Sequence, residues 1–99
     1  MELREITEQN YQQILDLSTG KGQEKFVMPN LYSLAHAWVF RKTARPYALY
    51  EGEEPVGFMM FDWRPEEKTA EIWRFMIDHR YQGKGYGRAA LELALGLSG

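Results

Sequence analysis

Apolar residues recur along the chain at strand and helix spacings, and these spacings predict the first elements. Alternation of apolar and charged positions predicts a short strand over residues 2–7. A helix is predicted over residues 8–17, because Thr7 can cap its first turn and Gly20 lies just beyond its end. Residues 21–30 are predicted to form a loop, polar at first and then apolar.

A second helix is predicted from Asn30, because apolar residues follow it at the spacing i, i+3, i+4, i+7 and i+8. The stripe consists of Leu31, Leu34, Ala35, Trp38 and Val39. We expect this stripe to face the core. His36 lies off the stripe, so a ligand or catalytic role for it is not expected, and the basic residues 41–45 are predicted to form an exposed turn.

A β-hairpin is predicted next. Residues 46–50 and 56–63 have strand character, and residues 51–55 contain the glycine and proline typical of a turn. A second turn over residues 64–68 leads to a third strand over residues 69–77.

The last predicted element is a helix over residues 88–97. Its expected core face consists of Ala90, Leu91, Ala94, Leu95 and Leu97. The order is therefore β-α-α-β-β-β-α, without internal repeats, and it predicts a single α/β (α+β) domain over residues 1–99.

Composition narrows the classes of function. A hydrophobic content of 44% and an aromatic content of 14% are typical of a folded domain, and a net charge of −2 argues against general nucleic-acid binding. The chain has no cysteine and two isolated histidines, so neither a thiol nucleophile nor a metal site is expected. No apolar stretch approaches the length of a membrane span, and the first residues lack the pattern of a signal peptide. We therefore expect a cytoplasmic protein that binds no membrane.

Glycines stand at every second position between the last predicted strand and helix, at Gly83, Gly85 and Gly87. Glycine adopts backbone conformations that other residues avoid, so consecutive N–H groups can point into one hollow. The following helix adds unpaired N–H groups and a partial positive charge, and Lys84 and Arg88 add whole charges. Such a loop favours a phosphate group. The alternative is a flexible turn.

The spacing of the loop excludes the two best-known phosphate loops. It is neither the G-x-G-x-x-G of dinucleotide folds nor the G-x-x-x-x-G-K-[ST] of nucleotide triphosphatases. Residues 82–87 have the pattern Q-x-x-G-x-G, which begins at Gln82. This pattern resembles the acyl-CoA pyrophosphate loop of the GNAT superfamily of N-acyltransferases. Together with the loop, residues 73–78 resemble the strand before it in the diamine and spermidine acetyltransferases. A generic anion-binding domain is the weaker reading.

The resemblance implies a mixed, mainly antiparallel sheet and acetyl-CoA as co-substrate. It implies that the pyrophosphate is held by Gln82, Gly83, Lys84, Gly85, Tyr86, Gly87 and Arg88. It also implies that pantetheine and the acetyl carbonyl pair with the backbone of Phe75, Met76 and Ile77. The side chains of Phe75 and Ile77 are expected to pack in the core. A free strand edge offers backbone groups that suit an amide-bearing ligand.

Acetyl transfer to an amine needs a proton acceptor, because a free alkylammonium has a pKa of about 10.4. By resemblance to histone-type members of the superfamily, Glu71 is the implied catalytic residue, six residues before Ile77. The alternative for Glu71 is an exposed strand residue without a catalytic role. Tyr81 and Tyr86 are expected to be structural.

Charge is unevenly distributed along the sequence. Residues 51–71 carry seven acids against two bases, and residues 74–88 carry four bases against one acid. We expect an acidic side that attracts a cationic amine and a basic side that attracts the phosphates of CoA. This distribution favours polyamine-like acceptors.

The resembled fold continues beyond the last helix with further strands and a helix, so we expect a GNAT domain truncated at that point. The first hypothesis is an acetyl-CoA-dependent N-acetyltransferase acting on a primary amine such as the polyamine spermidine. The alternative is a catalytically impaired remnant that binds CoA weakly or associates with itself. A homodimer is expected, in which a second copy covers the apolar surface of the fourth strand and last helix.

Overall fold

A computed structural model describes residues 1–20 and 30–98. Its elements are β1 (Glu2–Glu5), α1 (Tyr11–Leu15), α2 (Asn30–Val39), β2 (Ala44–Glu51), β3 (Glu54–Arg64), β4 (Thr69–Ile77), the 3-10 helix η1 (His79–Tyr81) and α3 (Tyr86–Ser98). The predicted β-α-α-β-β-β-α order is confirmed. Of the predicted loop over residues 21–30, all but Asn30 lies outside the described residues.

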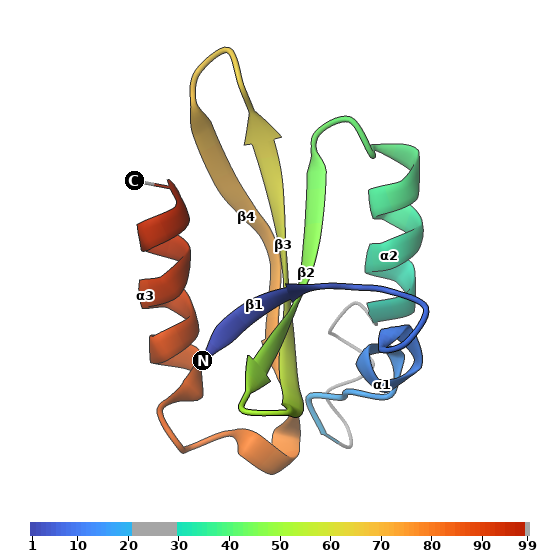
Figure 1. The fold of residues 1–99 in the computed structure, drawn as a ribbon, viewed down its shortest axis with the longest axis vertical. Helices are drawn as coiled ribbons and strands as arrows, with labels where there is room; N and C mark the ends of the chain where they lie inside the picture. Colours follow the sequence, from blue (N-terminus) through green and yellow to red (C-terminus); the bar gives the residue numbers. More distant parts are fainter. Residues whose placement is uncertain (21–29, 99) are drawn as a thin grey trace.

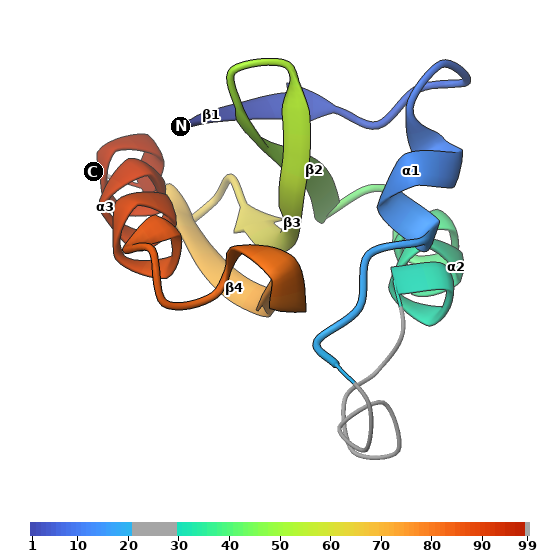
Figure 2. The same ribbon diagram turned by 90° about the horizontal axis from the view of Figure 1, so that it is seen from below.

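The four strands form one antiparallel sheet in the order β1-β2-β3-β4. Helices α1 and α2 cover one face of this sheet, and α3 covers the other (Figures 1 and 2). Strand β4 pairs only with β3 among the described strands, so its outer side is an edge. None of the described helices is long and apolar enough to cross a membrane.

Side chains that alternate along the strands build a core on each face of the sheet. Phe58 and Met60 of β3 belong to the core beneath α1 and α2. Met59 and Phe61 belong to the core beneath α3. This arrangement leaves the central strand β3 buried on both sides and fixes the position of β4 beside it.

The prediction for the buried face of α2 is correct for Leu34, which packs against the core beneath α1 and α2, and wrong for the rest of the stripe. Leu31, Trp38 and Val39 are 65%, 68% and 67% exposed, and the residues that α2 buries are Asn30, Ser33 and Ala37. Small side chains let the helix lie close to the sheet. The side-chain amide of Asn30 donates a hydrogen bond to the carbonyl of Ile14 (2.7 Å), so this buried amide has a partner.

Both other helices differ in part from the prediction. Helix α1 is shorter, because Thr7 and Asn10 exchange bonds one turn ahead of it: the Thr7 N–H donates to the Asn10 side chain (2.8 Å). Helix α3 begins at Tyr86, two residues earlier than predicted. Its buried residues Ala90 and Ala94 were predicted correctly, whereas the expected core residues Leu91 and Leu95 are 43% and 70% exposed. The side chain of the fifth expected residue, Leu97, lies outside the described part.

Strand β4 has the predicted bounds but contains an irregularity. Arg74 pairs with Met60 and Ile72 pairs with Phe61, so Trp73 is an extra residue on β4. A β-bulge of this kind bends its strand and changes which face the neighbouring side chains occupy. Trp73 packs on the α2 side of the sheet, where its ring lies 5.2 Å from that of His36.

Candidate functional site

The glycine loop connects the end of β4 to α3 at one end of the sheet (Figure 1). Gly83 and Gly85 have φ angles of +81° and +82°, in the left-handed region that favours glycine. A Cβ at either position would have no atom within 4 Å, so backbone conformation rather than space requires glycine there. Gly87 has no such angle and lies in the first turn of α3, so the expectation that all three glycines need special conformations is wrong for Gly87.

Backbone N–H groups around this loop are available to a ligand. Within residues 1–20 and 30–98, the N–H groups from Gly85 to Arg88 donate to no protein acceptor, and the first helical N–H that does is that of Ala89, to the carbonyl of Gly85 (3.1 Å). Three of these groups belong to the first turn of α3, where the helix dipole adds partial positive charge. A run of such N–H groups at the start of a helix can bind a phosphate.

The outer edge of β4 continues from the loop. The Asp78 N–H donates to the Val56 carbonyl (2.8 Å), so in the alternating antiparallel pattern Ile77 is a residue whose backbone groups point away from β3. By the same alternation Phe75 points its N–H and C=O outward, whereas Met76 directs them toward β3. Of the three residues expected to pair with pantetheine, Phe75 and Ile77 thus offer their backbone groups to the edge.

Gln82 joins the loop to this edge. Its side-chain amide donates a hydrogen bond to the carbonyl of Ile77 (3.0 Å), which independently shows that this carbonyl points outward. A Cβ at Gly87 would lie 3.9 Å from the Phe75 ring, so α3 packs directly on the strand. The expected core packing of the Phe75 and Ile77 side chains is confirmed, because both belong to the core beneath α3.

Asp78 holds the segment between β4 and the glycine loop in place, a role that was not predicted from the sequence. Its carboxylate, 2% exposed, accepts hydrogen bonds from the Arg80 N–H (3.0 Å), the Arg80 Nε (2.8 Å) and the Ser18 N–H (3.0 Å). Burial alone would raise the pKa of Asp78, but the hydrogen bonds from Arg80 and Ser18 outweigh it, so the pKa lies below its ordinary value. The spacing of Asp78 and Arg80, an acid two residues before a base at a strand end, is the only signal in the sequence.

Cationic side chains surround the loop. The Lys84 Nζ lies 5.8 Å from the centre of the Tyr81 ring, and Arg80 lies 5.3 Å from the same ring. The Tyr81 and Tyr86 rings are 6.2 Å apart and pack against the core beneath α3, which is consistent with the structural role expected for them. Lys84 itself is exposed, so its charge is available to an anion at the loop.

Glu71 lies far along β4 from the loop. Six residues of strand span about 20 Å, so Glu71 is close to the opposite end of the sheet from Gln82. It is exposed and pairs with the buried Asp62 of β3 on the α2 side. The hydrogen bond of Arg64 to Asp62 raises the pKa of Arg64, and the negative charge of Glu71 acts in the same direction.

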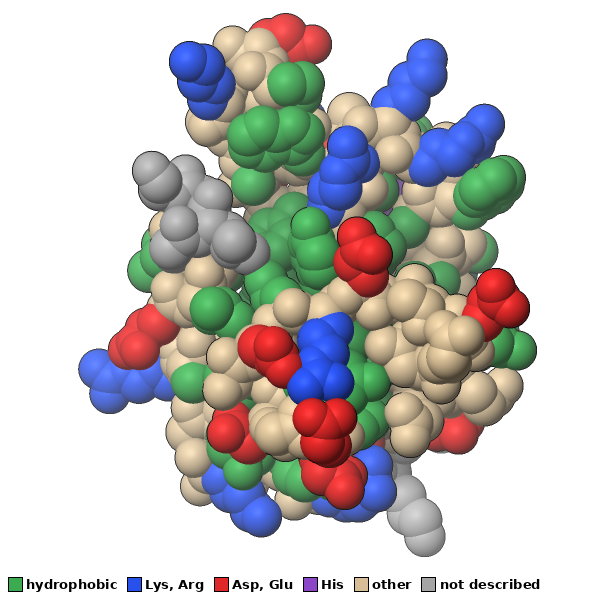
Figure 3. All heavy atoms as spheres, in the orientation of Figure 1, with side chains coloured by type: hydrophobic (Ala, Val, Ile, Leu, Met, Phe, Trp, Pro, Cys, Tyr) green, Lys and Arg blue, Asp and Glu red, His purple; other side chains and the backbone are tan. Residues whose placement is uncertain are grey.

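The expected division into an acidic and a basic side holds for Glu66, Glu67 and Glu71, at the far end of the sheet from the loop, but not for the acids of the turn between β2 and β3. Glu51, Glu53 and Glu54 lie at the turn between β2 and β3, at the same end of the sheet as the glycine loop (Figure 1). The hydrogen bond from Arg80 to Asp78 chiefly raises the pKa of Arg80, and the negative charge of the nearby Glu54 acts in the same direction. Figure 3 shows acidic and basic side chains interspersed over one face of the molecule. Acids that are close together in the sequence lie at opposite ends of the sheet, because β3 runs from one end to the other between them.

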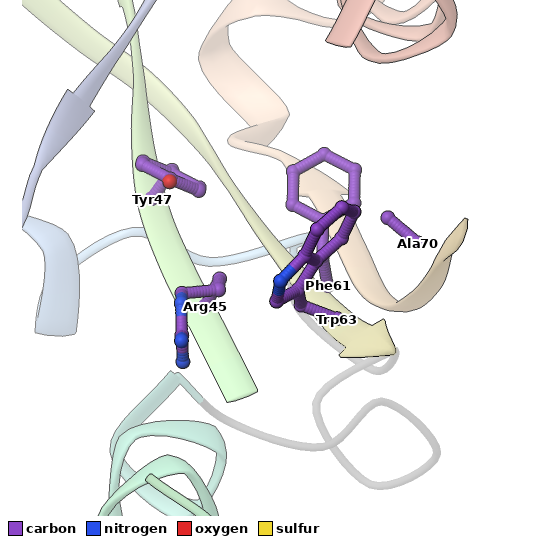
Figure 4. Close-up of a pocket in the computed structure, with 5 residues that line it drawn as sticks. All are labelled: Arg45, Tyr47, Phe61, Trp63 and Ala70. Atoms are coloured by element: carbon purple, nitrogen blue, oxygen red, sulfur yellow. The ribbon is translucent and has the colours of Figure 1, made fainter. Parts of the chain in front are cut away.

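An aromatic cavity of about 290 Å³ lies apart from the loop, at the other end of the sheet on the α3 side (Figure 4). The guanidinium of Arg45 points away from the rings of Phe61 and Trp63, and it donates to the carbonyls of Arg41, Lys42 and Ala44. The lining residues are Arg45, Tyr47, Phe61, Trp63 and Ala70. The described residues contain no group of three or more His, Cys, Asp or Glu side chains that could hold a metal ion.

A family model described as "Acetyltransferase (GNAT) family" matches residues 5–97. The chain belongs to this acetyltransferase family. The resemblance to this superfamily and the expected fold class are thereby confirmed.

Two curated relatives agree with the GNAT assignment. The chain is 33% identical over 96 residues to "Spermine/spermidine N(1)-acetyltransferase" of Bacillus subtilis (strain 168). It is 32% identical over 96 residues to "Probable spermine N(1)-acetyltransferase" of Bacillus subtilis subsp. natto (strain BEST195). Each match covers 91% of this chain and 62% of the relative, so the chain spans less than two thirds of their length.

Proposed function

We propose that this GNAT chain binds acetyl-CoA and serves in acetyl transfer to a primary amine, with polyamines as the acceptor class. The observation that carries the proposal is the continuity of two binding surfaces. The free N–H groups from Gly85 to Arg88 lie in the loop that follows the outward backbone groups of Phe75 and Ile77. A ligand with a diphosphate at one end and amides along its length fits this pair of surfaces.

The parts of the chain have separate roles in this proposal. The loop would hold the diphosphate through backbone N–H groups, with Lys84 and Arg88 adding charge. The edge of β4 would orient the pantetheine arm through Phe75 and Ile77. Bound there, acetyl-CoA supplies the thioester, and the protein contributes by positioning the two reactants and by removing a proton.

Glu71 is the proposed proton acceptor. It is an exposed carboxylate on the strand that would orient the acyl carrier, and a cationic amine is attracted to it by charge. Because Glu71 is about 20 Å along β4 from the loop, the acceptor amine would enter from the end of the sheet opposite the diphosphate.

The length of the chain relative to its relatives supports a second candidate. Because the match covers 62% of each relative, the alternative is that these residues bind CoA weakly without turnover. Both candidates share the loop and the strand edge, and they differ only in catalysis.

Two measurements test these candidates. Isothermal titration with acetyl-CoA should give a saturable heat, and a flat titration at millimolar ligand would refute binding by this chain. A steady-state assay with acetyl-CoA and either spermidine or spermine then distinguishes the two. Release of free CoA that depends on the amine supports the enzyme, whereas binding without turnover supports the alternative.

A further inference from the structure

Helix α2 has an inverted distribution of side chains. Its sheet-facing side carries Asn30, Ser33 and Ala37, which are small or polar and are buried. Its outward side carries the large apolar residues, including Leu31 and Trp38, and the helix contains no Asp, Glu, Lys or Arg. A solvated helix normally shows the opposite pattern, so the outward side has the character of a buried surface.

The outward side also contains a groove. A groove of about 480 Å³ runs along it and is lined by Tyr32, Ala35, His36, Val39 and Phe40. Figures 1 and 2 show α2 on the outside of the molecule, with the sheet on its inner side only. Arg41 borders this surface, because its guanidinium lies 4.5 Å from the centre of the Trp38 ring and donates to the Trp38 carbonyl. Arg45 instead donates to the carbonyls of Arg41 and Lys42.

We propose that a second copy of this chain docks on α2 in an antiparallel arrangement, with a two-fold axis at Ala35. The apolar residues are arranged symmetrically about Ala35 in the sequence: Leu31 and Val39 lie four residues away on either side, and Tyr32 and Trp38 lie three away. In a two-fold pair, each residue on one copy meets its counterpart across the axis.

The pairing follows from that symmetry. Leu31 contacts Val39 of the partner subunit, Tyr32 contacts Trp38 of the partner subunit, and the two Ala35 methyl groups meet at the axis. Leu31, Ala35 and Val39 form a ridge of i, i+4 spacing, which packs into the groove beside the same ridge of a neighbouring helix. The small side chain at the centre lets the two helix axes approach closely, and no like charges meet there.

The available area matches what a dimer requires. Aromatic side chains carry about 150 to 250 Å² each, so Tyr32, Trp38 and Phe40, which are 56%, 68% and 49% exposed, present roughly 350 Å². Leu31 and Val39 add roughly 100 Å². A standard interface buries about 800 Å² per partner, of which about 450 to 520 Å² is apolar. The face therefore supplies the apolar part of one standard interface.

Cysteine cross-linking tests this geometry directly, because the chain contains no cysteine of its own. The variant Ala35→Cys should form a disulfide-linked dimer under mild oxidation, since residues at the axis approach within about 7 Å. Leu31→Cys alone should not, whereas an equal mixture of Leu31→Cys and Val39→Cys should give mixed dimers. The matched control is Leu95→Cys, which is exposed to a similar extent on α3 and should stay monomeric on a reducing-agent-free gel.

Light scattering on the whole chain provides the second measurement. The wild-type protein should have the mass of a dimer, Ala35→Glu should have the mass of a monomer with an unchanged circular dichroism spectrum, and Leu95→Glu should remain a dimer. Three results would each overturn the proposal. The first is a wild-type monomer at all concentrations, and the second is a dimer that Leu95→Glu breaks and Ala35→Glu does not. The third is a monomer that sediments with phosphatidylserine vesicles through α2.

Discussion

The buried carboxylate of Asp78 holds together the end of β4, the glycine loop and the segment after α1, so replacing it with Asn tests how that end of the fold is stabilised. Asparagine has the same shape but offers only one acceptor oxygen. In the better orientation it keeps both hydrogen bonds from Arg80, which reach one carboxylate oxygen. Its amide N–H₂ then faces the N–H of Ser18, which donates to the other oxygen at 3.0 Å.

The expected cost combines two effects. The Ser18 N–H is left without its acceptor, and a buried donor without a partner costs about 1 to 3 kcal/mol. The bonds from Arg80 lose their charged acceptor, but Arg80 is 58% exposed, so solvent reduces this second effect. We expect Asp78→Asn to lower the free energy of unfolding by about 2 to 3 kcal/mol.

Urea unfolding at one fixed protein concentration measures this cost. With a slope of about 1 to 2 kcal/mol per M for a small domain, the midpoint should fall by roughly 1 to 3 M. Asp16→Asn is the matched control, because Asp16 is exposed and accepts one long bond, 3.4 Å, from Gln12. Equal midpoints for the two variants would refute the structural role of Asp78.

The pH dependence follows from the lowered pKa of Asp78. A carboxyl whose folded pKa is below its unfolded value stabilises the fold fully above the unfolded pKa, about 3.9, and loses that effect as the pH falls through the folded pKa. The difference in stability between wild type and Asp78→Asn should therefore be largest near neutral pH and shrink below about pH 4. A difference that is constant down to the acid transition would contradict this reasoning.

Three further predictions concern the loop, the proposed base and the sheet. Gly85→Ala forces a side chain into the left-handed region at a cost of about 1 to 2 kcal/mol and should weaken acetyl-CoA binding about tenfold by titration, whereas Gly87→Ala should change it less than about twofold. Glu71→Gln should lower kcat at least about 100-fold with acetyl-CoA affinity unchanged, and equal loss in Glu67→Gln, in the neighbouring turn, would remove Glu71 from catalysis. Gly57→Ala would press a methyl group against the carbonyl oxygen of Met76 and should destabilise the protein by about 1 to 3 kcal/mol in urea unfolding; wild-type stability would show that the close approach of β3 and β4 is not required.

Local patterns in the sequence were sufficient for the order of the elements and for the bounds of β4. Alternation and turn residues depend on neighbours in the chain, and those neighbours are visible in the sequence. The two positive φ angles at Gly83 and Gly85 likewise agree with a local requirement for glycine. The third glycine differs, because Gly87 already lies within α3, whose start no capping residue marks in the sequence.

Features that depend on distant residues were not predictable in this way. The apolar stripe of α2 predicted its buried side, but the contacts with the rest of the fold bury Asn30, Ser33 and Ala37 instead. Asn30 becomes a core residue only because the carbonyl of Ile14 lies beside it. Asp78 becomes a central acceptor only because Ser18 arrives from α1. Such partners are 16 and 60 residues away in the chain.

The extra residue at Trp73 affects how positions on β4 are matched between related proteins. In an unbroken strand, Glu71 and Ile77 would share a face, since an even number of steps separates them. The bulge places Glu71 on the face covered by α2 while Ile77 stays on the face covered by α3. A homologue that lacked one residue between Ile72 and Phe75 would therefore carry its carboxylate on the other side of the sheet. Equivalent carboxylates in such homologues should be sought by counting outward from the bulge instead of backward from the glycines.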